Sequence, residues 1–395
     1  MRLARGVLKG LQEHLSDLVG LVPARTPTRM SLSDALGCVL AEDICATRPI
    51  PSFASSAMDG YAIRVADVPG RLDVTSHVAA GQVPDVGVRP GTAVKVMTGA
   101  LIPEGAEAVV PIEVVEDEGT SITVAVAPTP GAHVRFAGSD APAGATLLAA
   151  GTVITAARVA LLASVGAVTP LVRPRPRVLV VSTGDELVDA GVTPGPAQLV
   201  DSNRPALLAA VREAGCLPID GGRVSDQPGG LLEVLEAGEA DLVVTSGGVS
   251  VGDHDVVKAA LLALPTVHFE RVAVQPGMPQ AWGHLPGGRP FLGLPGNPVS
   301  ALVSWELFGR AALGLDRRHD TRPLAQDVTG SPADKHQLLR GRLAGGEVVI
   351  VGGPGSHLLV ALGQADLLVI IPAGVEALAA GAMVDVIDLG GPVAA

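Results

Sequence analysis

Apolar residues near the amino terminus repeat at helical spacing, at Leu8, Leu11, Leu15, Leu18, Val19 and Val22. This spacing places them on one face and predicts a helix. A second short helix is predicted from Ser33 to about Ala41. We therefore expect the amino-terminal region to be helical.

The hydrophobic pattern changes between residues 61 and 150. Short Val-rich runs alternate there with Gly and Pro, as in GTAVKVMTGALIPEGAEAVVPIEVV, and this pattern is typical of strands joined by tight turns. The following segment, LVRPRPRVLVV, contains Pro174 and Pro176, which disfavour a helix and extend the chain. We therefore expect a β domain and then a linker that enters a new domain at about residue 176.

Strands and helices alternate from Arg177 to about Leu315. VLVVSTGDEL is followed by NRPALLAAVREAG, DLVVTSGGVS by VVKAALLAL, and PFLGLPGNP by VSALVSWELFGRAALG. Near-continuous apolar strands that alternate with helices predict a doubly wound parallel sheet. After residue 330, glycine-bounded strands such as LLVIIPAG predict a small β domain or barrel, with a helical turn around His357 to Leu362.

Composition narrows the class of protein. The chain has 395 residues, of which 48% are hydrophobic, so it can bury several cores. A net charge of −12 argues against a nucleic-acid partner, because a phosphate backbone binds a basic face. No segment approaches the roughly 20 apolar residues that span a bilayer, and the charged amino terminus does not resemble a signal peptide, so no membrane partner is expected. The scattered Cys38, Cys45 and Cys216 fit a reducing cytoplasm.

Polar residues gather in three loops that follow predicted strands. The loops are Ser182-Thr-Gly-Asp185-Glu186, Ser246-Gly-Gly-Val-Ser250 with Asp253 and Asp255, and Pro295-Gly-Asn297-Pro298 with Ser300. In an open parallel sheet, ligands bind outside the carboxyl ends of the strands, where helix amino termini present free N–H groups. We therefore expect the three loops to line one pocket.

Plainer interpretations compete with this one. Asn297 before Pro298 is a favoured helix start. Asp253 could be only an N-cap, with Asp255 complementing the helix dipole, instead of holding a cation. His254 between these acids could bind a metal, although a solvated loop histidine explains it as well. Gly248-Val-Ser250-Val-Gly252 spells a serine-nucleophile pattern, but the predicted helix begins several residues after the serine. P-loop, GxGxxG and HExxH motifs are absent.

Seven short motifs occur in order: SSAMDGYA, MTGALIPEGAEAVV, STGDEL, TSGGVSVGDHD, QPGMP, GLPGNPVSALVSWELF and GSHLL. Together they resemble the molybdopterin molybdenumtransferase family, to which a domain of animal gephyrin is related. The resemblance covers nearly the whole chain and is looser over residues 1 to 30.

The resemblance implies an elongated, multidomain α/β protein. Its expected parts are a helical and linker domain formed by residues 1–50 and about 146–175, a β-rich domain over 51–145, a doubly wound parallel-sheet molybdopterin-binding domain over 176–320, and a carboxy-terminal β-barrel-like domain over 321–395. It also implies a homodimer in which the β-rich domain of one subunit completes the pocket of the other.

The implied reaction is the last step of molybdenum cofactor assembly. Molybdate is inserted into adenylylated molybdopterin with loss of AMP, and a divalent cation such as Mg²⁺ assists. An upstream molybdopterin adenylyltransferase would supply the substrate. A phosphate-bearing substrate suits helix amino termini and glycine N–H groups, and cleavage of a pyrophosphate suits a cation held by carboxylates.

The resemblance also assigns residues. Catalytic roles fall on Asp59, Glu186, Asp226 and Asp255, of which Glu186, Asp226 and Asp255 are expected to hold the metal. Substrate-binding roles fall on Thr98, Asp140, Thr183, Asp185, Ser246, Gly247, Gly248, Ser250, Pro276, Gly277, Pro295, Gly296, Asn297 and Pro298. Molybdate-binding roles fall on Ser300, Arg340 and Ser356, since hydroxyl and guanidinium donors suit an oxyanion.

Two segments depart from the family pattern. Many members read Lys-Pro-Gly-Lys-Pro where this chain has Gln275-Pro-Gly-Met278-Pro, so Arg271 or Arg340 is expected to carry more of the charge. The segment before SAMDGYA lacks an Asp-Asn pair common there. Two other functions stay open: a non-catalytic dimeric scaffold of the gephyrin kind, and a related pterin-binding or nucleotide-cleaving enzyme that shares only the SGGVS domain.

Overall fold

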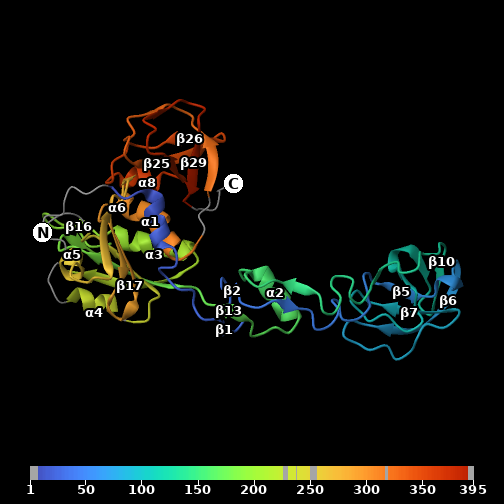
Figure 1. Cartoon of the computed structure of the whole chain (residues 1–395). Helices are drawn as coiled ribbons and strands as arrows, with labels where there is room; N and C mark the ends of the chain where they lie inside the picture. Colours follow the sequence, from blue (N-terminus) through green and yellow to red (C-terminus); the bar gives the residue numbers. More distant parts are fainter. Residues whose placement is uncertain (1–7, 226–229, 237, 250–255, 316–318, 390–395) are drawn as a thin grey trace. The chain divides into compact units, whose positions relative to one another are not determined.

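The computed structural model describes residues 8–225, 230–236, 238–249, 256–315 and 319–389. The chain divides into two compact units (Figure 1). The major unit joins Met1–Thr26 to Arg175–Ala395, and the minor unit is Pro27–Pro174. No helix within the described ranges is both long and apolar enough to cross a membrane.

A six-stranded sheet forms the centre of the major unit. In spatial order its strands are β17 (Leu217–Val224), β14 (Arg177–Thr183), β18 (Leu242–Ser246), β22 (Pro290–Leu294), β21 (Pro279–His284) and β19 (Val267–Arg271). The strands β17, β14, β18 and β22 pair in parallel, as predicted, whereas β21 runs antiparallel to both of its neighbours. Only short connections flank β21, and a parallel pairing would need a long crossover.

Helices cover both faces of this sheet. Successive strand residues point to opposite faces, so Val180 and Val244 pack against Leu207 of one helical layer, while Val243 packs against Leu261 of the other. The first layer contains α1 (Leu11–Leu18), α3 (Asn203–Glu213), α6 (Pro298–Ser304) and α7 (Arg310–Ala312), and the second contains α4 (Gly230–Glu236) and α5 (Val256–Leu261) (Figure 1). The domain is therefore doubly wound.

The carboxy-terminal part of the major unit is a curled sheet. Its spatial order is β20 (Val274–Gln275), β25 (His336–Ala344), β27 (Leu367–Ile371), β29 (Met383–Asp388) and β23 (His319–Pro323), and β26 (Glu347–Ile350) pairs with β25. A bridge between Leu324 and Val348 links the ends of this sheet around a core that includes Val369 and Val386. Smaller elements are α8 (Leu359–Gly363), the pair β24 (Val328–Thr329) and β28 (Ala377–Leu378), and the pair β15 (Leu187–Val188) and β16 (Leu199–Val200). The predicted helical turn is α8.

The minor unit is rich in β-structure. Its largest sheet has the order β8 (Ala108–Pro111), β5 (Gly60–Ile63), β7 (Thr92–Val96), β6 (Gly70–Val78), β10 (Ser121–Val124) and β9 (Val115–Asp117). Smaller pairings join β1 (Thr28–Arg29), β13 (Leu171–Arg173) and β2 (Val39–Leu40); β12 (Thr146–Leu148) and β3 (Ile44–Cys45); and β11 (Val134–Arg135) and β4 (Ser55–Ser56). The helix α2 (Ala156–Ser164) also belongs to this unit.

The helix predicted from Ser33 to about Ala41 is wrong. Those residues form turns and then the strand β2. Gly37 adopts a positive φ of 78°, which no right-handed helix allows. The N–H groups of Gly37 and Leu40 donate to the carbonyls of Ile154 and Thr152, so long-range pairing replaces the local helix.

Candidate functional site

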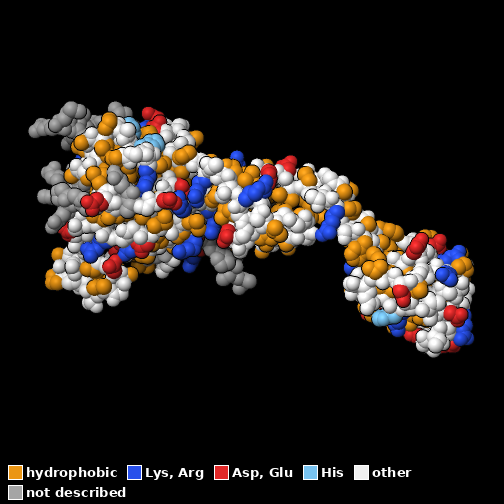
Figure 2. All heavy atoms as spheres, turned by 90° about the horizontal axis from the view of Figure 1, so that it is seen from below, with side chains coloured by type: hydrophobic (Ala, Val, Ile, Leu, Met, Phe, Trp, Pro, Cys, Tyr) orange, Lys and Arg blue, Asp and Glu red, His pale blue; other side chains and the backbone are white. Residues whose placement is uncertain are grey.

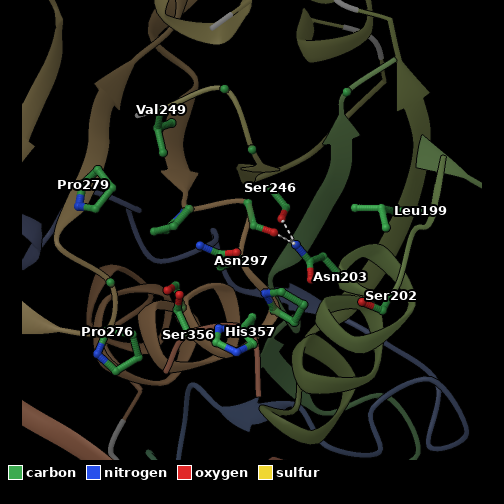
Figure 3. Close-up of a pocket in the computed structure, with 18 of the residues that line it drawn as sticks. Leu199, Ser202, Asn203, Ser246, Val249, Pro276, Pro279, Asn297, Ser356 and His357 are labelled. Carbon is green, nitrogen blue, oxygen red and sulfur yellow. Dashed lines mark hydrogen bonds between the residues drawn. The ribbon is translucent and has the colours of Figure 1, made fainter. Parts of the chain in front are cut away.

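A cavity of about 1000 Å³ lies at the carboxyl edge of the central sheet (Figure 3). The ends of β14 and β18 meet there, because the two strands pair in register at Ser182 and Ser246. The N–H of Gly247 donates to the carbonyl of Leu294, which joins the end of β22 to the same edge. The three loops expected from the sequence thus converge on one cavity.

Glycine is required in the loop after β18. Gly247 has a φ of 98°, and a Cβ atom there would lie 2.9 Å from the carbonyl oxygen of Thr183. Gly248 has a φ of 69°, and its Cβ atom would lie 2.6 Å from a methyl group of Val257. Both residues line the cavity, so the backbone itself forms this part of the wall and a ligand can approach it closely.

Asn203 fastens two of the converging loops together. It is the first residue of α3, and its Nδ2 donates to Ser246 Oγ at 2.8 Å and to the carbonyl oxygen of Gly296 at 2.6 Å (Figure 3). Oδ1 of the same side chain is buried and has no hydrogen-bond partner within the described structure. In the sequence, Asn203 is simply the first residue of the segment NRPALLAAVREAG that is predicted as a helix. Its position directly after a strand-to-helix loop at the carboxyl edge was the available signal for a site role.

The helix α6 provides another wall. Its N-cap residue Asn297 makes no side-chain capping bond, so the helix-start interpretation of this residue does not account for its side chain. Asn297 lines the cavity together with Pro298 and the nearly buried Ser300. The first turn of α6 therefore presents side-chain donors to the cavity.

The loop between β19 and β21 closes a third side and is held by a buried glutamine. Nε2 of Gln280 donates to the carbonyl oxygen of Gly277 at 2.6 Å and to Ser304 Oγ of α6 at 2.7 Å. Gly277 has a φ of 104°, and a Cβ atom there would lie 2.9 Å from Ser304 Oγ. Gln275, Pro276 and Met278 of this loop line the cavity.

The carboxy-terminal sheet contributes the loop from Pro354 to His357. The carbonyl of Ser356 accepts a hydrogen bond from the N–H of Val299 at 3.2 Å, which holds this loop against α6. Both Ser356 and His357 line the cavity near Asn297 and Pro276 (Figure 3). His357 lies in the GSHLL motif, in which the family resemblance implies a role only for its neighbour Ser356.

Arg340 lies behind this loop, on β25, and is fully buried. Its Nη2 donates to the carbonyl of Gly353, while Nε and Nη1 are buried without a partner in the described structure. Burial lowers the pKa of this guanidinium from its ordinary value. A buried, incompletely paired cation is costly, and an oxyanion is the ligand that would complete its hydrogen bonds.

Among the described residues, two acids line the cavity, and they differ in their surroundings. Asp201 is buried and accepts hydrogen bonds at 3.1 Å from both the N–H and the Nε of Arg204, which also binds Asp189 and Asp220. Glu186 is exposed, and its carboxylate lies over Gly184, where a Cβ atom would be 2.7 Å from Oε2. Of the two, Glu186 is the carboxylate that a ligand in the cavity can reach.

The cavity contains most of the predicted residues of the major unit. It is lined by Thr183, Glu186, Ser246, Gly247, Gly248, Pro276, Gly277, Pro295, Gly296, Asn297, Pro298, Ser300 and Ser356. Asp185 is exposed and does not line it. Asp226, Ser250, Asp253, His254 and Asp255 lie outside the described residues, so the nucleophile and capping interpretations of that loop stay predictions. Within the described ranges, no group of three or more His, Cys, Asp or Glu residues forms a metal-binding cluster.

In the minor unit, Asp59 and Thr98 form one local arrangement. Oδ1 of Asp59 accepts hydrogen bonds from the N–H of Thr98 at 2.6 Å and from its hydroxyl at 2.9 Å. These bonds, the backbone one foremost, lower the pKa of Asp59. A Cβ atom at Gly60 would lie 2.2 Å from the carbonyl oxygen of Val110, so the Asp-Gly turn needs glycine to enter β5. Asp140 is exposed in a different loop, where its N–H donates to the carbonyl of Ile50.

Three family models match the chain. A MoeA N-terminal region (domain I and II) matches residues 9–166, a probable molybdopterin binding domain matches residues 179–314, and a MoeA C-terminal region (domain IV) matches residues 321–389.

Similar proteins agree with these matches. Molybdopterin molybdenumtransferase 2 of Mycobacterium tuberculosis is 39% identical over 406 residues, which cover 97% of this chain and all of that protein. The molybdopterin molybdenumtransferase of a Nostoc species is 35% identical over 379 residues, covering 90% of this chain and 87% of that one. A crystal structure of the molybdopterin biosynthesis MoeA protein of a Pyrococcus species superposes with a TM-score of 0.81 at 30% identity and covers 98% of this chain and 100% of the other.

Proposed function

Because the chain belongs to the MoeA family of molybdopterin molybdenumtransferases, we propose that it inserts molybdate into adenylylated molybdopterin and releases AMP, the last step of molybdenum cofactor assembly. The observation that carries the proposal is the cavity, whose wall combines glycine backbone at Gly247 and Gly248 with the first turn of α6. Glycine turns let a phosphate approach the backbone closely, and the side chains of Asn297 and Ser300 offer hydrogen-bond donors to it.

The molybdate end of the substrate site is assigned to Ser300, Ser356 and Arg340. The two serines line the cavity from α6 and from the Pro354–His357 loop. Arg340 supports that loop through Gly353 and has two buried N–H groups without partners in the described structure. A tetrahedral oxyanion at this end would accept hydrogen bonds from hydroxyl groups and, after a small shift of the loop, from the guanidinium.

A divalent cation such as Mg²⁺ is part of the proposal. Glu186 fits it, because its exposed carboxylate lines the cavity and hard oxygen ligands suit Mg²⁺. Asp226 and Asp255 are the other proposed ligands. When bound, the cation would neutralise charge that develops on the phosphates as AMP leaves. Asp59 is the proposed catalytic carboxylate of the minor unit, and the hydrogen bonds from Thr98 that lower its pKa stabilise the ionised form.

We also propose a cytoplasmic homodimer in which the β-rich domain of one subunit completes the pocket of the other. The strand pair of β4 and β11 supports this proposal, since it places Ser55 opposite Arg135 and brings the exposed Phe53 and Phe136 to the same region of the minor unit. Hydrophobic side chains also gather on the surface of this unit, coloured orange in Figure 2. Exposed aromatic side chains of this kind are typical of protein interfaces.

The four-domain division predicted from the sequence belongs to the same proposal. The model matches over residues 179–314 and 321–389 support a molybdopterin-binding domain over 176–320 and a carboxy-terminal β domain over 321–395. The helical and linker domain and the β-rich domain would then share the minor unit and the amino terminus. An upstream molybdopterin adenylyltransferase would supply the substrate.

The decisive experiment mixes the purified chain with adenylylated molybdopterin, MgCl₂ and molybdate and follows AMP and cofactor formation. We expect AMP release that depends on molybdate and on Mg²⁺. A scaffold protein would release no AMP above the background of a protein-free sample, and that result would reject the transferase. AMP release without molybdate insertion would instead favour a nucleotide-cleaving enzyme.

A further inference from the structure

The cavity takes an anionic substrate under the proposed function, yet its described wall lacks strong cations. None of the residues that line it in the described ranges is lysine or arginine, and His357 is its one basic side chain. The wall includes the acids Glu186 and Asp201. A dianion entering such a cavity is stabilised by a nearby positive charge, and an arginine whose side chain contacts a lining residue can provide it.

Arg271 is such an arginine, and the topology explains its position. It is the last residue of β19, and it pairs with Pro279, the first residue of β21. Because β21 is antiparallel to both β19 and β22, β19 runs parallel to β22 and ends at the same edge of the sheet. This is the edge at which the cavity lies.

The guanidinium of Arg271 rests against a residue of the cavity wall. Its Nε and Nη2 lie 3.3 Å and 3.1 Å from the sulfur of Met278. The carbonyl of Met278 accepts a hydrogen bond from the N–H of Val272 at 2.8 Å, which fixes the short loop that carries both groups. A thioether is a weak acceptor, so this contact positions the guanidinium without neutralising it.

Acids near Arg271 in the sequence do not neutralise it. Glu270 points to the opposite face of β19, where its carboxylate binds Lys9, His14 and Trp282. Arg271 forms no ion pair with any carboxylate of the described residues, and its side chain is exposed. By contrast, Arg204 at the same edge is bound to three carboxylates.

We propose that Arg271 is a second oxyanion-binding cation of the cavity beside the buried Arg340, held at the wall by Met278 until an oxyanion replaces the sulfur. The inference rests on the proposed function and adds to it a specificity residue for a tetrahedral oxyanion, either molybdate or a phosphate group of the adenylylated pterin. Exchange of a neutral sulfur for a charged oxygen strengthens the hydrogen bonds, and the planar guanidinium presents two parallel donors to such a group.

The test measures binding rather than turnover. The full-length chain and its variants are titrated calorimetrically with sodium molybdate and, separately, with sodium pyrophosphate. We expect Arg271→Gln to weaken binding of at least one probe by roughly 10- to 100-fold, as for loss of a hydrogen bond to a charged group. A loss confined to molybdate identifies the molybdate subsite, and a loss confined to pyrophosphate identifies a diphosphate subsite.

Three further variants make the test specific. Arg271→Lys keeps the charge but not the paired donors, so its affinity should fall between those of the wild type and Arg271→Gln. Met278→Leu removes the sulfur at similar volume and should bind as tightly as the wild type or more tightly. Arg342→Gln removes one positive charge from an exposed position of β25 that does not line the cavity, and should bind like the wild type.

Unchanged affinity of Arg271→Gln for both probes would overturn the inference, as would a wild-type chain that binds neither. An equal loss in Arg271→Gln and Arg342→Gln would also overturn it, because it would show only a general effect of net charge. Since no step of the test needs turnover, failure of the inference is distinguishable from absence of AMP release, which would reject the transferase itself.

Discussion

The side-chain amide of Asn203 bridges the ends of two strand-loop segments, with Nδ2 2.8 Å from Ser246 Oγ and 2.6 Å from the carbonyl oxygen of Gly296. The carbonyl oxygen of Gly296 can only accept a hydrogen bond, so the end of the Asn203 amide that faces it must be the NH₂ group. This determines the orientation of the amide. One side chain thus sets the spacing between the loop after β18 and the loop before α6, both of which line the cavity.

We predict that Asn203→Ala separates these loops and raises KM for adenylylated molybdopterin about tenfold, while the free energy of unfolding falls by about 1–2 kcal/mol. Initial rates of AMP release over a range of substrate concentrations give KM and kcat separately. Ser202→Ala is the matched control, since Ser202 also lines the cavity but makes no side-chain capping bond. Reduced stability with an unchanged KM would show that Asn203 serves the fold alone.

Arg340 should stabilise the complex with molybdate but not the free protein. Removing the buried guanidinium in Arg340→Met eliminates two unpartnered N–H groups, so the free energy of unfolding should stay equal or rise by about 1–2 kcal/mol. Molybdate should raise the Tm of the wild type but not of this variant. Arg342→Met, from the exposed end of β25, should keep the molybdate response. A strongly destabilised Arg340→Met would instead indicate that its bond to Gly353 dominates.

The alternating hydrophobic pattern predicted the doubly wound domain well, because buried strands such as Leu242–Ser246 and helices such as Asn203–Glu213 carry their signal locally. It missed the direction of β21, which depends on the length of its connections rather than on its own residues. It also predicted a helix at Ser33, where pairing with residues 152 and 154 prevails. The direction of β21 thus follows from short connections, whereas the loss of the helix at Ser33 follows from contacts that are distant in sequence.

For the candidate site, too, the local sequence predicted the elements better than the contacts between them. Loops after strands were predictable, since parallel strands bring their carboxyl ends together. The roles of individual side chains were harder to predict. Asn203 begins α3 and Asn297 precedes α6, and only the three-dimensional contacts show that neither side chain caps its helix. The contact between Arg271 and Met278 joins residues on either side of a loop and had no local signature.

Glu186 tests the cation part of the proposed function. Its carboxylate is exposed on the cavity wall, so Glu186→Gln should fold normally and yet lose AMP release by 100-fold or more, as on the order of 3 kcal/mol of charge stabilisation disappears. Partial recovery at high MgCl₂ would indicate a weakened metal site. Glu347→Gln, an exposed change on β26, should keep full activity. Equal rates for the wild type and Glu186→Gln would remove Glu186 from the reaction.

Two substitutions of Asp59 distinguish the effect of its negative charge from the effect of its hydrogen bonds on the loop. Asn at this position still offers an oxygen to the N–H and hydroxyl of Thr98, so Asp59→Asn should keep the turn, whereas Asp59→Ala should lose it. If the negative charge is needed, both variants lose AMP release, but only Asp59→Ala changes the amide exchange of Thr98. Thr98→Val removes the hydroxyl bond alone and should leave most of the activity. An active Asp59→Asn would contradict a catalytic role for the carboxylate.

Glu270 should make stability depend on pH in the acidic range. Burial alone would raise its pKa, but hydrogen bonds from His14, Lys9 and Trp282 outweigh burial and lower it to about 2. The folded pKa is below the ordinary value of 4.5, so the stabilisation is fully present above pH 4.5 and is lost as the pH falls toward 2.

This shift corresponds to about 3 kcal/mol at neutral pH. The free energy of unfolding of the wild type, measured in urea, should therefore fall steeply between pH 4.5 and pH 2. Glu270→Gln should have a lower free energy of unfolding at pH 7 and should lack most of this pH dependence. Glu213→Gln, at an exposed position of α3, should follow the wild-type curve. If the curves of wild type and Glu270→Gln ran parallel from pH 7 to pH 2, the contacts of Glu270 with Lys9 and His14 would contribute no net charge stabilisation, and α1 would be held to the sheet by apolar packing and backbone hydrogen bonds.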